Sequence, residues 1–282
     1  MATKGTVKID NVVCNVTKLM EAKGKGEYTS LQGYTISSNY IHMLVMLSNK
    51  DTTAVLARGE GQTTVSSLAI SDSKYLKHGN DCAFNKNFLI AQGGGEDPNT
   101  TIKCFNSSFN LLGQYTYQTM AGKNPLNTVS CLAYISGNYF FLGSGKIYAV
   151  CSLDETNKIF QEVSRVSISD EIINQLKRTG CTLLSQGIYY AKNKLYKVYS
   201  HKDSNNKILR NDIVIYDLPG SSPKFNGKVS LNAVYACDRI EKELFEIESI
   251  SSPDNGNSFY MATNQMENST TQKDCIYKII LG

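Results

Sequence analysis

Two groups of polar side chains in this 282-residue sequence have types and spacings that suit chemistry. Glu246 and Glu248 alternate in a strand-like stretch, so both carboxylates would face the same side of that strand. Such a pair suits glycoside hydrolysis, in which one carboxyl group is the acid and the other is the base or nucleophile. In the segment His78-Gly79-Asn80-Asp81, a histidine oriented by a carboxylate could act as a base or contact a ligand or metal.

Both groups also have purely structural interpretations. Asn and Asp in a turn satisfy backbone groups, and buried polar side chains in a channel hydrogen-bond one another and trapped water. Spacing alone does not decide between these interpretations. We therefore assign no catalytic residue, no metal ligand and no cofactor, and Ca²⁺ is the one ion that the carboxylates would suit.

The polar groups stand at the starts of predicted strands in a repeated unit of strand, tight turn, strand and two further strands. The units are marked by Gly33, His78, Ser130, Gln186 and Glu246, which lie about 45 to 60 residues apart. A repeat of this length with four short strands is typical of a propeller blade.

We predict an all-β fold, a five-bladed β-propeller formed as a single domain by residues 1–282, with six blades as the alternative count. The expected blades are 31–77, 78–128, 129–181, 182–240 and 241–282. The last unit shows three strands of its own, so the N-terminal strand 5–16 is expected to join it and close the ring without a free edge. A helix is predicted over 170–178, as an insertion between units. A β-sandwich or a β-helix is the rival fold, but a sandwich does not require the recurring unit and a β-helix has shorter repeats.

In a propeller, the first strand of each unit lines the central channel, so the starts of these strands meet at one mouth. Polar side chains from distant parts of the sequence are therefore expected to converge in a concave place, which predicts a ligand-binding site. The residues expected there are Gln32, His78, Asn80, Asp81, Ser130, Gln186, Glu246 and Glu248.

Composition narrows the class of protein. The net charge is +4 and the basic residues are scattered, which argues against nucleic-acid binding. No apolar run reaches 18 residues, so no membrane span is predicted. The eight cysteines include no Cys-x-x-Cys pair, and the first residues show no signal-peptide core. We expect reduced thiols in a protein made in the cytoplasm.

The segments Gln32-Gly33, His78-Gly79-Asn80-Asp81, Gln186-Gly187 and Glu246-Ile247-Glu248-Ser249 resemble the inner-strand starts of certain bacterial and phage propellers. Helveticin J-type bacteriocins and teichoic-acid-associated phage-like proteins belong to this class. The resemblance implies a five-bladed propeller that acts at a bacterial envelope. It also implies a component of a virion or phage-tail-like particle that contacts surface glycan, and the missing secretion signal agrees with release by lysis.

Two classes of function follow. The first is a non-enzymatic binding or structural module, open to multimeric assembly, whose aromatic and amide groups contact a glycan or a protein partner. The alternative is a hydrolase of a glycan or envelope polymer that uses His78, Asp81, Glu246 and Glu248, with Ca²⁺ as an assisting ion.

Overall fold

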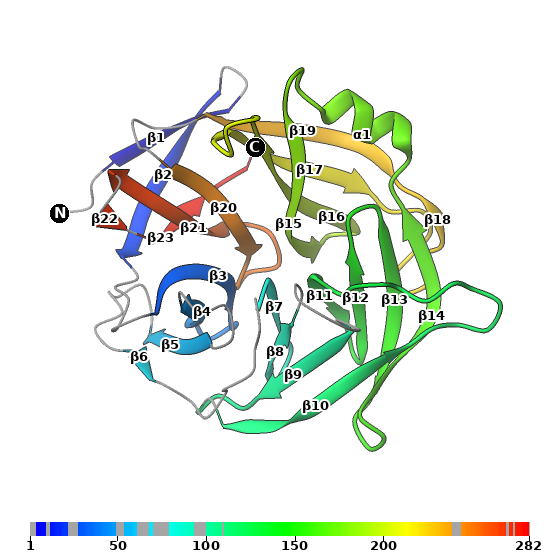
Figure 1. The fold of residues 1–282 in the computed structure, drawn as a ribbon. Helices are drawn as coiled ribbons and strands as arrows, with labels where there is room; N and C mark the ends of the chain where they lie inside the picture. Colours follow the sequence, from blue (N-terminus) through cyan, green and yellow to red (C-terminus); the bar gives the residue numbers. More distant parts are fainter. Residues whose placement is uncertain are drawn as a thin grey trace.

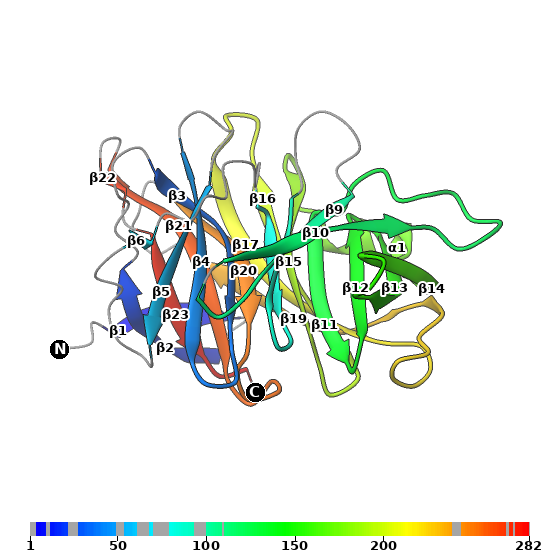
Figure 2. The same cartoon turned by 90° about the horizontal axis from the view of Figure 1, so that it is seen from below.

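The recurring strand–turn–strand units of the sequence form β-sheets arranged around a common centre (Figure 1). The structure is a computed structural model. It describes residues 4–9, 12–21, 28–48, 54–60, 68–69, 79–92, 100–108, 110–238, 244–268, 271–272 and 274–281. The fold is an all-β propeller, as predicted. Seen from the side, the long strands run across the thickness of the ring (Figure 2).

Hydrogen bonds join the described strands into four sheets. One contains β3 (Tyr28–Ile36), β4 (Ile41–Ser48), β5 (Ala54–Glu60) and β6 (Leu68–Ala69). The nine-stranded sheet contains β7 (Asp81–Phe84), β8 (Phe88–Ala91), β9 (Thr101–Phe105), β10 (Leu111–Gln118), β11 (Cys131–Ser136), β12 (Tyr139–Ser144), β13 (Ile147–Asp154), β14 (Ile159–Ser167) and β18 (Gly227–Lys228). A third contains β15 (Thr182–Ala191), β16 (Lys194–Lys202), β17 (Ile208–Asp217) and β19 (Ser230–Asp238). The last contains β1 (Lys4–Ile9), β2 (Val12–Glu21), β20 (Leu244–Ser251), β21 (Phe259–Asn268), β22 (Thr271–Gln272) and β23 (Cys275–Ile279).

The strands nearest the centre are β3, β7, β11, β15 and β20. Each of them contacts the next around the ring, and β20 contacts β3 (Figure 1). Apolar clusters fill the spaces between neighbouring groups of strands. In one of them, Phe141 of β12 stacks on Phe225 with ring centroids 5.6 Å apart. Burial of these faces orients the inner strands and so positions the side chains of the channel.

The nine-stranded sheet arises because two outer strands pair with each other. β10 runs beside β14 in parallel, with Thr116 opposite Ile159 and Gln118 opposite Gln161. This pairing links the outer edges of β7–β10 and β11–β14, which would otherwise each expose unpaired backbone groups. The repeat pattern did not predict it.

The N-terminal residues join the sheet of β20 to β23, as expected, but through different residues from the predicted 5–16. The strand that pairs with β23 is β2, in antiparallel register with Thr17 opposite Lys278 and Glu21 opposite Cys275. β1 pairs with β2 and forms a further strand outside it. The prediction merged two strands that Asp10-Asn11, a pair of turn-forming residues, separates in the sequence.

The predicted helix is present as α1 (Asp170–Leu176), between β14 and β15. The Ser169 side chain caps it by accepting a hydrogen bond from the Ile172 N–H at 3.3 Å. In the part of the chain that the structure describes, no helix is long and apolar enough to cross a membrane. Among the described residues, no two cysteines form a disulfide with each other.

Candidate functional site

Asp81, at the start of β7, is a fully buried carboxylate at the centre of the ring. Its Oδ2 accepts hydrogen bonds from the backbone N–H groups of Leu132 on β11 and Ile188 on β15, both at 3.0 Å. Its Oδ1 accepts from the Cys82 N–H and from the Ser249 hydroxyl on β20, also at 3.0 Å. One side chain therefore ties β7 to three other inner strands.

This arrangement follows from the position of the inner strands. Each has one edge that faces the channel, where its N–H groups find no partner in its own sheet, and a buried N–H without a partner is costly. Asp274 meets the same need for β3, because its Oδ2 accepts from the Leu31 N–H at 2.7 Å. Asn211 meets it for β20 by accepting from the Ile247 N–H at 3.1 Å. Buried carboxylate and amide groups thus supply the hydrogen-bond acceptors that a neighbouring strand would otherwise provide.

Burial raises the pKa of Asp81 to about 7, because desolvation of the carboxylate outweighs its hydrogen bonds and the nearby Lys197 charge. Lys197 is itself fully buried. Its Nζ donates to the Gln186 carbonyl and lies 3.3 Å from the Cys131 Sγ and 5.4 Å from the centre of the Tyr199 ring. Among the described residues, the carboxyl group of Asp81 and the amino group of Lys197 therefore both lie buried near the middle of the channel.

The structure brings three of the predicted site residues together on the side of the channel where the inner strands begin. Gln186 Nε2 donates to Glu246 Oε1 at 2.6 Å. Burial raises the pKa of Glu246, and burial together with the Glu246 charge raises the pKa of Glu248 well above its usual range. Asn264, which lies on β21 and which the sequence analysis missed, hydrogen-bonds Glu248.

The remaining predicted residues make other contacts, and one of them lies outside the described residues. Gln32 Nε2 donates to the Ser30 hydroxyl at 3.0 Å. Ser130 donates to the Ser144 hydroxyl at 2.9 Å. The half-buried Asn80 directly precedes Asp81, and His78 lies outside the described residues. The structure thus brings Gln186, Glu246 and Glu248 together directly. It also connects Gln32 to Glu248, because Asn264 Nδ2 donates to the same Ser30 hydroxyl at 3.2 Å. Asp81 holds the inner strands together.

The buried polar residues that the sequence analysis missed share one signal. Asn211 lies two residues before the apolar run that begins at Ile213, and Asp274 directly precedes Cys275 and Ile276, so each adjoins an apolar strand segment in which polar residues are uncommon. Lys197 gives the same signal between Tyr196 and Val198 in β16. The predicted site residues all come from the first strands of the units, whereas these residues lie on or directly before the second and third strands.

Gly187 is closely confined by the groups around Asp81. A Cβ atom there would lie 2.9 Å from Asp81 Oδ1, 2.9 Å from the Ser249 Cα and 3.0 Å from the Glu248 carbonyl oxygen. We expect Gly187→Ala to lower the free energy of unfolding by about 1–3 kcal/mol, because backbone atoms must move. Gly113→Ala is the control, since its Cβ would meet only the flexible end of Lys158. Equal denaturant midpoints for the two variants would contradict this account.

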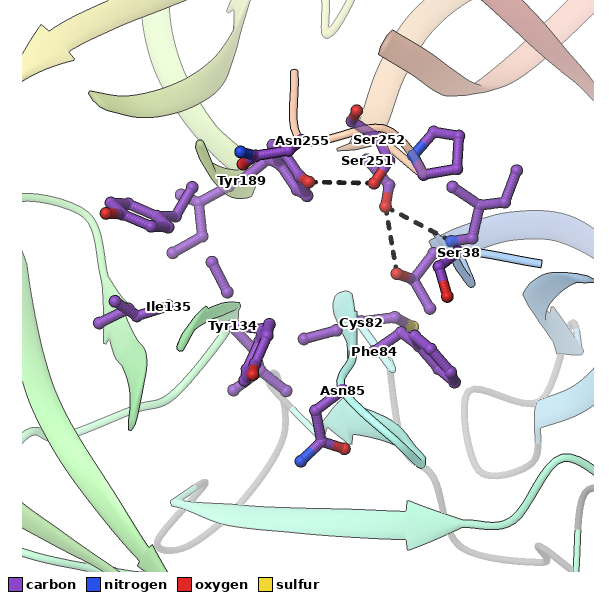
Figure 3. A pocket seen from close by; sticks show the side chains of 18 residues that line it. Ser38, Cys82, Phe84, Asn85, Tyr134, Ile135, Tyr189, Ser251, Ser252 and Asn255 are labelled. Atoms are coloured by element: carbon purple, nitrogen blue, oxygen red, sulfur yellow. Dashed lines mark hydrogen bonds between the residues drawn. The ribbon is translucent and has the colours of Figure 1, made fainter. Parts of the chain in front are cut away.

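The opposite end of the channel, where the inner strands finish, contains a pocket of about 330 Å³ (Figure 3). It is lined by residues of β3, β7, β11, β15 and β20 and of the turns that follow β3, β7 and β20. None of the seven predicted site residues that the structure describes lines it. We refer to it as the strand-end pocket.

No protein-family model and no curated protein matches the sequence. Among solved structures, the tail fiber of Staphylococcus aureus phage P68 is similar over 95% of this chain, with 13% identity and a TM-score of 0.57. The chain spans about half of that fiber, 53% of its length. A protein of unknown function from Dyadobacter fermentans matches 95% of this chain and 99% of its own, with 7% identity and a TM-score of 0.57.

An α-L-arabinanase from Cellvibrio cellulosa matches 89% of this chain and 92% of its own, with 10% identity and a TM-score of 0.51. At identities this low, the shared property is the fold. The likenesses and the ring of sheets together define the class of the protein, an all-β propeller.

Proposed function

We propose that this chain is a non-enzymatic binding and structural module of a phage tail or phage-tail-like particle that contacts a glycan or a protein partner. The observation that carries this proposal is the state of Asp81. Its carboxylate is fully buried and accepts four hydrogen bonds from the protein itself, so it holds strands together and does not face a substrate. The likeness to a phage tail fiber supports the particle setting.

We further propose that residues 1–282 form one five-bladed propeller with blades at 31–77, 78–128, 129–181, 182–240 and 241–282. The ring of contacts among the five inner strands supports this count. In this arrangement, the parallel pairing of β10 with β14 joins the second and third blades at their outer edges.

The proposed contacts on the strand-start side come from its half-buried polar groups. These are Gln32, Asn80, Ser130, Gln186 and Glu246. The amide and hydroxyl groups among them can both donate to and accept from the hydroxyls of a glycan or the backbone of a partner, and the Glu246 carboxylate can accept. His78 and Glu248 complete the proposed site, and Asp81 orients its strands from behind.

A hydrolase is the second candidate. The observation that favours it is the pair Glu246 and Glu248, because burial raises both pKa values and a carboxyl group whose pKa is raised by burial can act as a general acid. The Gln186 hydrogen bond to Glu246 would orient that group.

A glycan array combined with a turnover assay separates the two candidates. We expect the wild-type protein to bind bacterial surface glycans without shortening them, and Gln186→Ala to weaken binding by about tenfold, the loss of about one hydrogen bond. Gln114→Ala, an exposed glutamine on β10, is the matched control. Turnover of an envelope polymer that disappears in Glu246→Gln would contradict the binding-only function and establish the hydrolase.

A further inference from the structure

The strand-end pocket has the layout of a built binding site. Its walls carry the aromatic rings of Phe84, Tyr134 and Tyr189, which come from three different inner strands (Figure 3). Its rim carries Asn85 and Asn255, from the turns after β7 and β20. The volume of about 330 Å³ lies at the lower end of the range of about 300–1,000 Å³ for small-molecule sites. That size suits one ring rather than a length of polymer.

The aromatic walls are held in place from behind by a second row of rings. Phe84 packs against Phe88 with ring centroids 4.9 Å apart, and Tyr134 packs against Phe140 at 5.3 Å. Tyr189 meets Phe259 edge-on at 6.0 Å. The three wall residues are half-buried, so each is partly covered and partly exposed. Rings held in this way lose little conformational freedom when a ligand binds.

The pocket favours an uncharged ligand. Among the described residues that line it, none carries a formal charge. Burial raises the pKa of Tyr189 to about 12, so its hydroxyl stays neutral, and it donates to the Ser252 carbonyl at 3.0 Å. Leu132 and Ile188 also line the pocket, and their N–H groups are already bonded to Asp81. A charged ligand would lose hydration here without gaining a partner.

The rim supplies hydrogen-bonding groups around these apolar walls. Asn85 Oδ1 accepts a hydrogen bond from the Asn87 N–H at 2.9 Å, and this bond fixes the orientation of the side-chain amide. Asn255 is exposed, and its positive φ of 54° places it at the tip of the turn after β20. Ser38 adds an exposed hydroxyl from the turn after β3. Aromatic faces inside and amide or hydroxyl groups outside match a molecule with one apolar face and several hydroxyls.

We propose that the strand-end pocket binds a single uncharged sugar ring, a neutral hexose or N-acetylhexosamine unit. The C–H face of the ring would lie against Tyr134 and Tyr189, and its hydroxyls would meet Asn85 and Asn255. This site lies at the end of the channel opposite the strand-start residues, and the inference does not depend on the function proposed for them.

Saturation-transfer NMR on the full chain tests the proposal with methyl glycosides of neutral hexoses and of N-acetylhexosamines as probes. We expect transfer to at least one neutral probe and none to a methyl glucuronide, which carries a negative charge. Tyr134→Ala should weaken binding by about tenfold, and Tyr134→Phe should retain it because the ring remains. Tyr139→Ala is the matched control, a half-buried tyrosine on the next strand that does not line the pocket.

A second measurement does not depend on any variant folding. In a ¹H–¹⁵N titration of the wild-type protein, the amide signals of Asn85, Tyr134, Tyr189 and Asn255 should shift together with the neutral probe. Absence of transfer to any neutral probe would overturn the inference, as would shifts confined to Gln186 and Glu246. The latter result would leave the proposed strand-start site standing. Loss of binding in Tyr134→Ala with full binding in Gln186→Ala would support the strand-end pocket and count against the strand-start site.

Discussion

Replacing Asp81 with alanine is expected to lower the free energy of unfolding by about 3 kcal/mol or more. The substitution leaves the buried N–H groups of Leu132 and Ile188 and the Ser249 hydroxyl without their acceptor. Each unsatisfied buried polar group costs about 1–3 kcal/mol. Relief from burying the carboxylate offsets part of this loss, since burial already raises its pKa to about 7. The net effect remains large because three inner strands lose one shared partner.

Denaturant unfolding measures this effect, with tyrosine fluorescence as the signal in a chain of seventeen tyrosines and no tryptophan. Asp217→Ala is the control: this carboxylate is 47% exposed and lies 3.6 Å from the Lys194 Nζ, a pair worth about 0–1 kcal/mol. Equal stability of the two variants would mean that Asp81 is not the tie between strands. A carboxylate free of that role would be available to a substrate, and the hydrolase would become the stronger candidate.

The spacing of the strand starts was enough to predict the β-propeller, because each unit must bury both faces of its strands and can do so only between two neighbours. The parallel pairing of β10 with β14 and the separate strands β1 and β2 were not predictable in this way. The division into β1 and β2 follows from the turn-forming pair Asp10-Asn11, which the spacing of the repeats does not include. The pairing of β10 with β14 depends on which outer edges lie within hydrogen-bonding distance after the ring has formed. A repeat pattern contains no information about that distance.

The roles of individual channel residues were harder to predict than their location. Asp81 looked like a ligand contact because it stands beside His78, yet in the structure its acceptors are filled by inner-strand N–H groups. The pairing of every inner strand decides which backbone N–H groups have no acceptor in their own sheet. The strand-end pocket was not predicted because Tyr134 and Tyr189 occupy ordinary apolar positions in their strands. Only the space between the strands makes them the walls of a pocket.

The free energy of unfolding is expected to fall as the pH rises from about 5 to about 8, by roughly 2–4 kcal/mol. In the unfolded chain, Asp81 has its ordinary pKa of 3.8 and has released its proton by pH ~5. In the folded protein, burial raises this pKa to about 7, so the proton is still bound. The folded state therefore holds more protons than the unfolded state in this window, and raising the pH favours unfolding until the pH passes the folded pKa.

Glu246 and Glu248 act in the same direction, because burial raises their pKa values as well. The pKa of Glu162 is shifted in the opposite direction, because the hydrogen bonds from Arg165 and Tyr117 outweigh its burial and lower its pKa. It is therefore ionised in both states above about pH 5 and adds no slope in this window.

Unfolding curves at several pH values, measured for two variants, isolate the Asp81 contribution. Asp81→Asn should flatten the pH dependence of stability, since position 81 then no longer titrates, whatever the overall loss of stability. Glu162→Gln should lower stability by breaking its bonds to Arg165 and Tyr117 and leave the slope between about pH 5 and 8 unchanged. An unaltered slope in Asp81→Asn would mean that Asp81 is ionised throughout. Its four donors would then outweigh its burial, and the centre of the channel would hold a permanent charge beside Lys197.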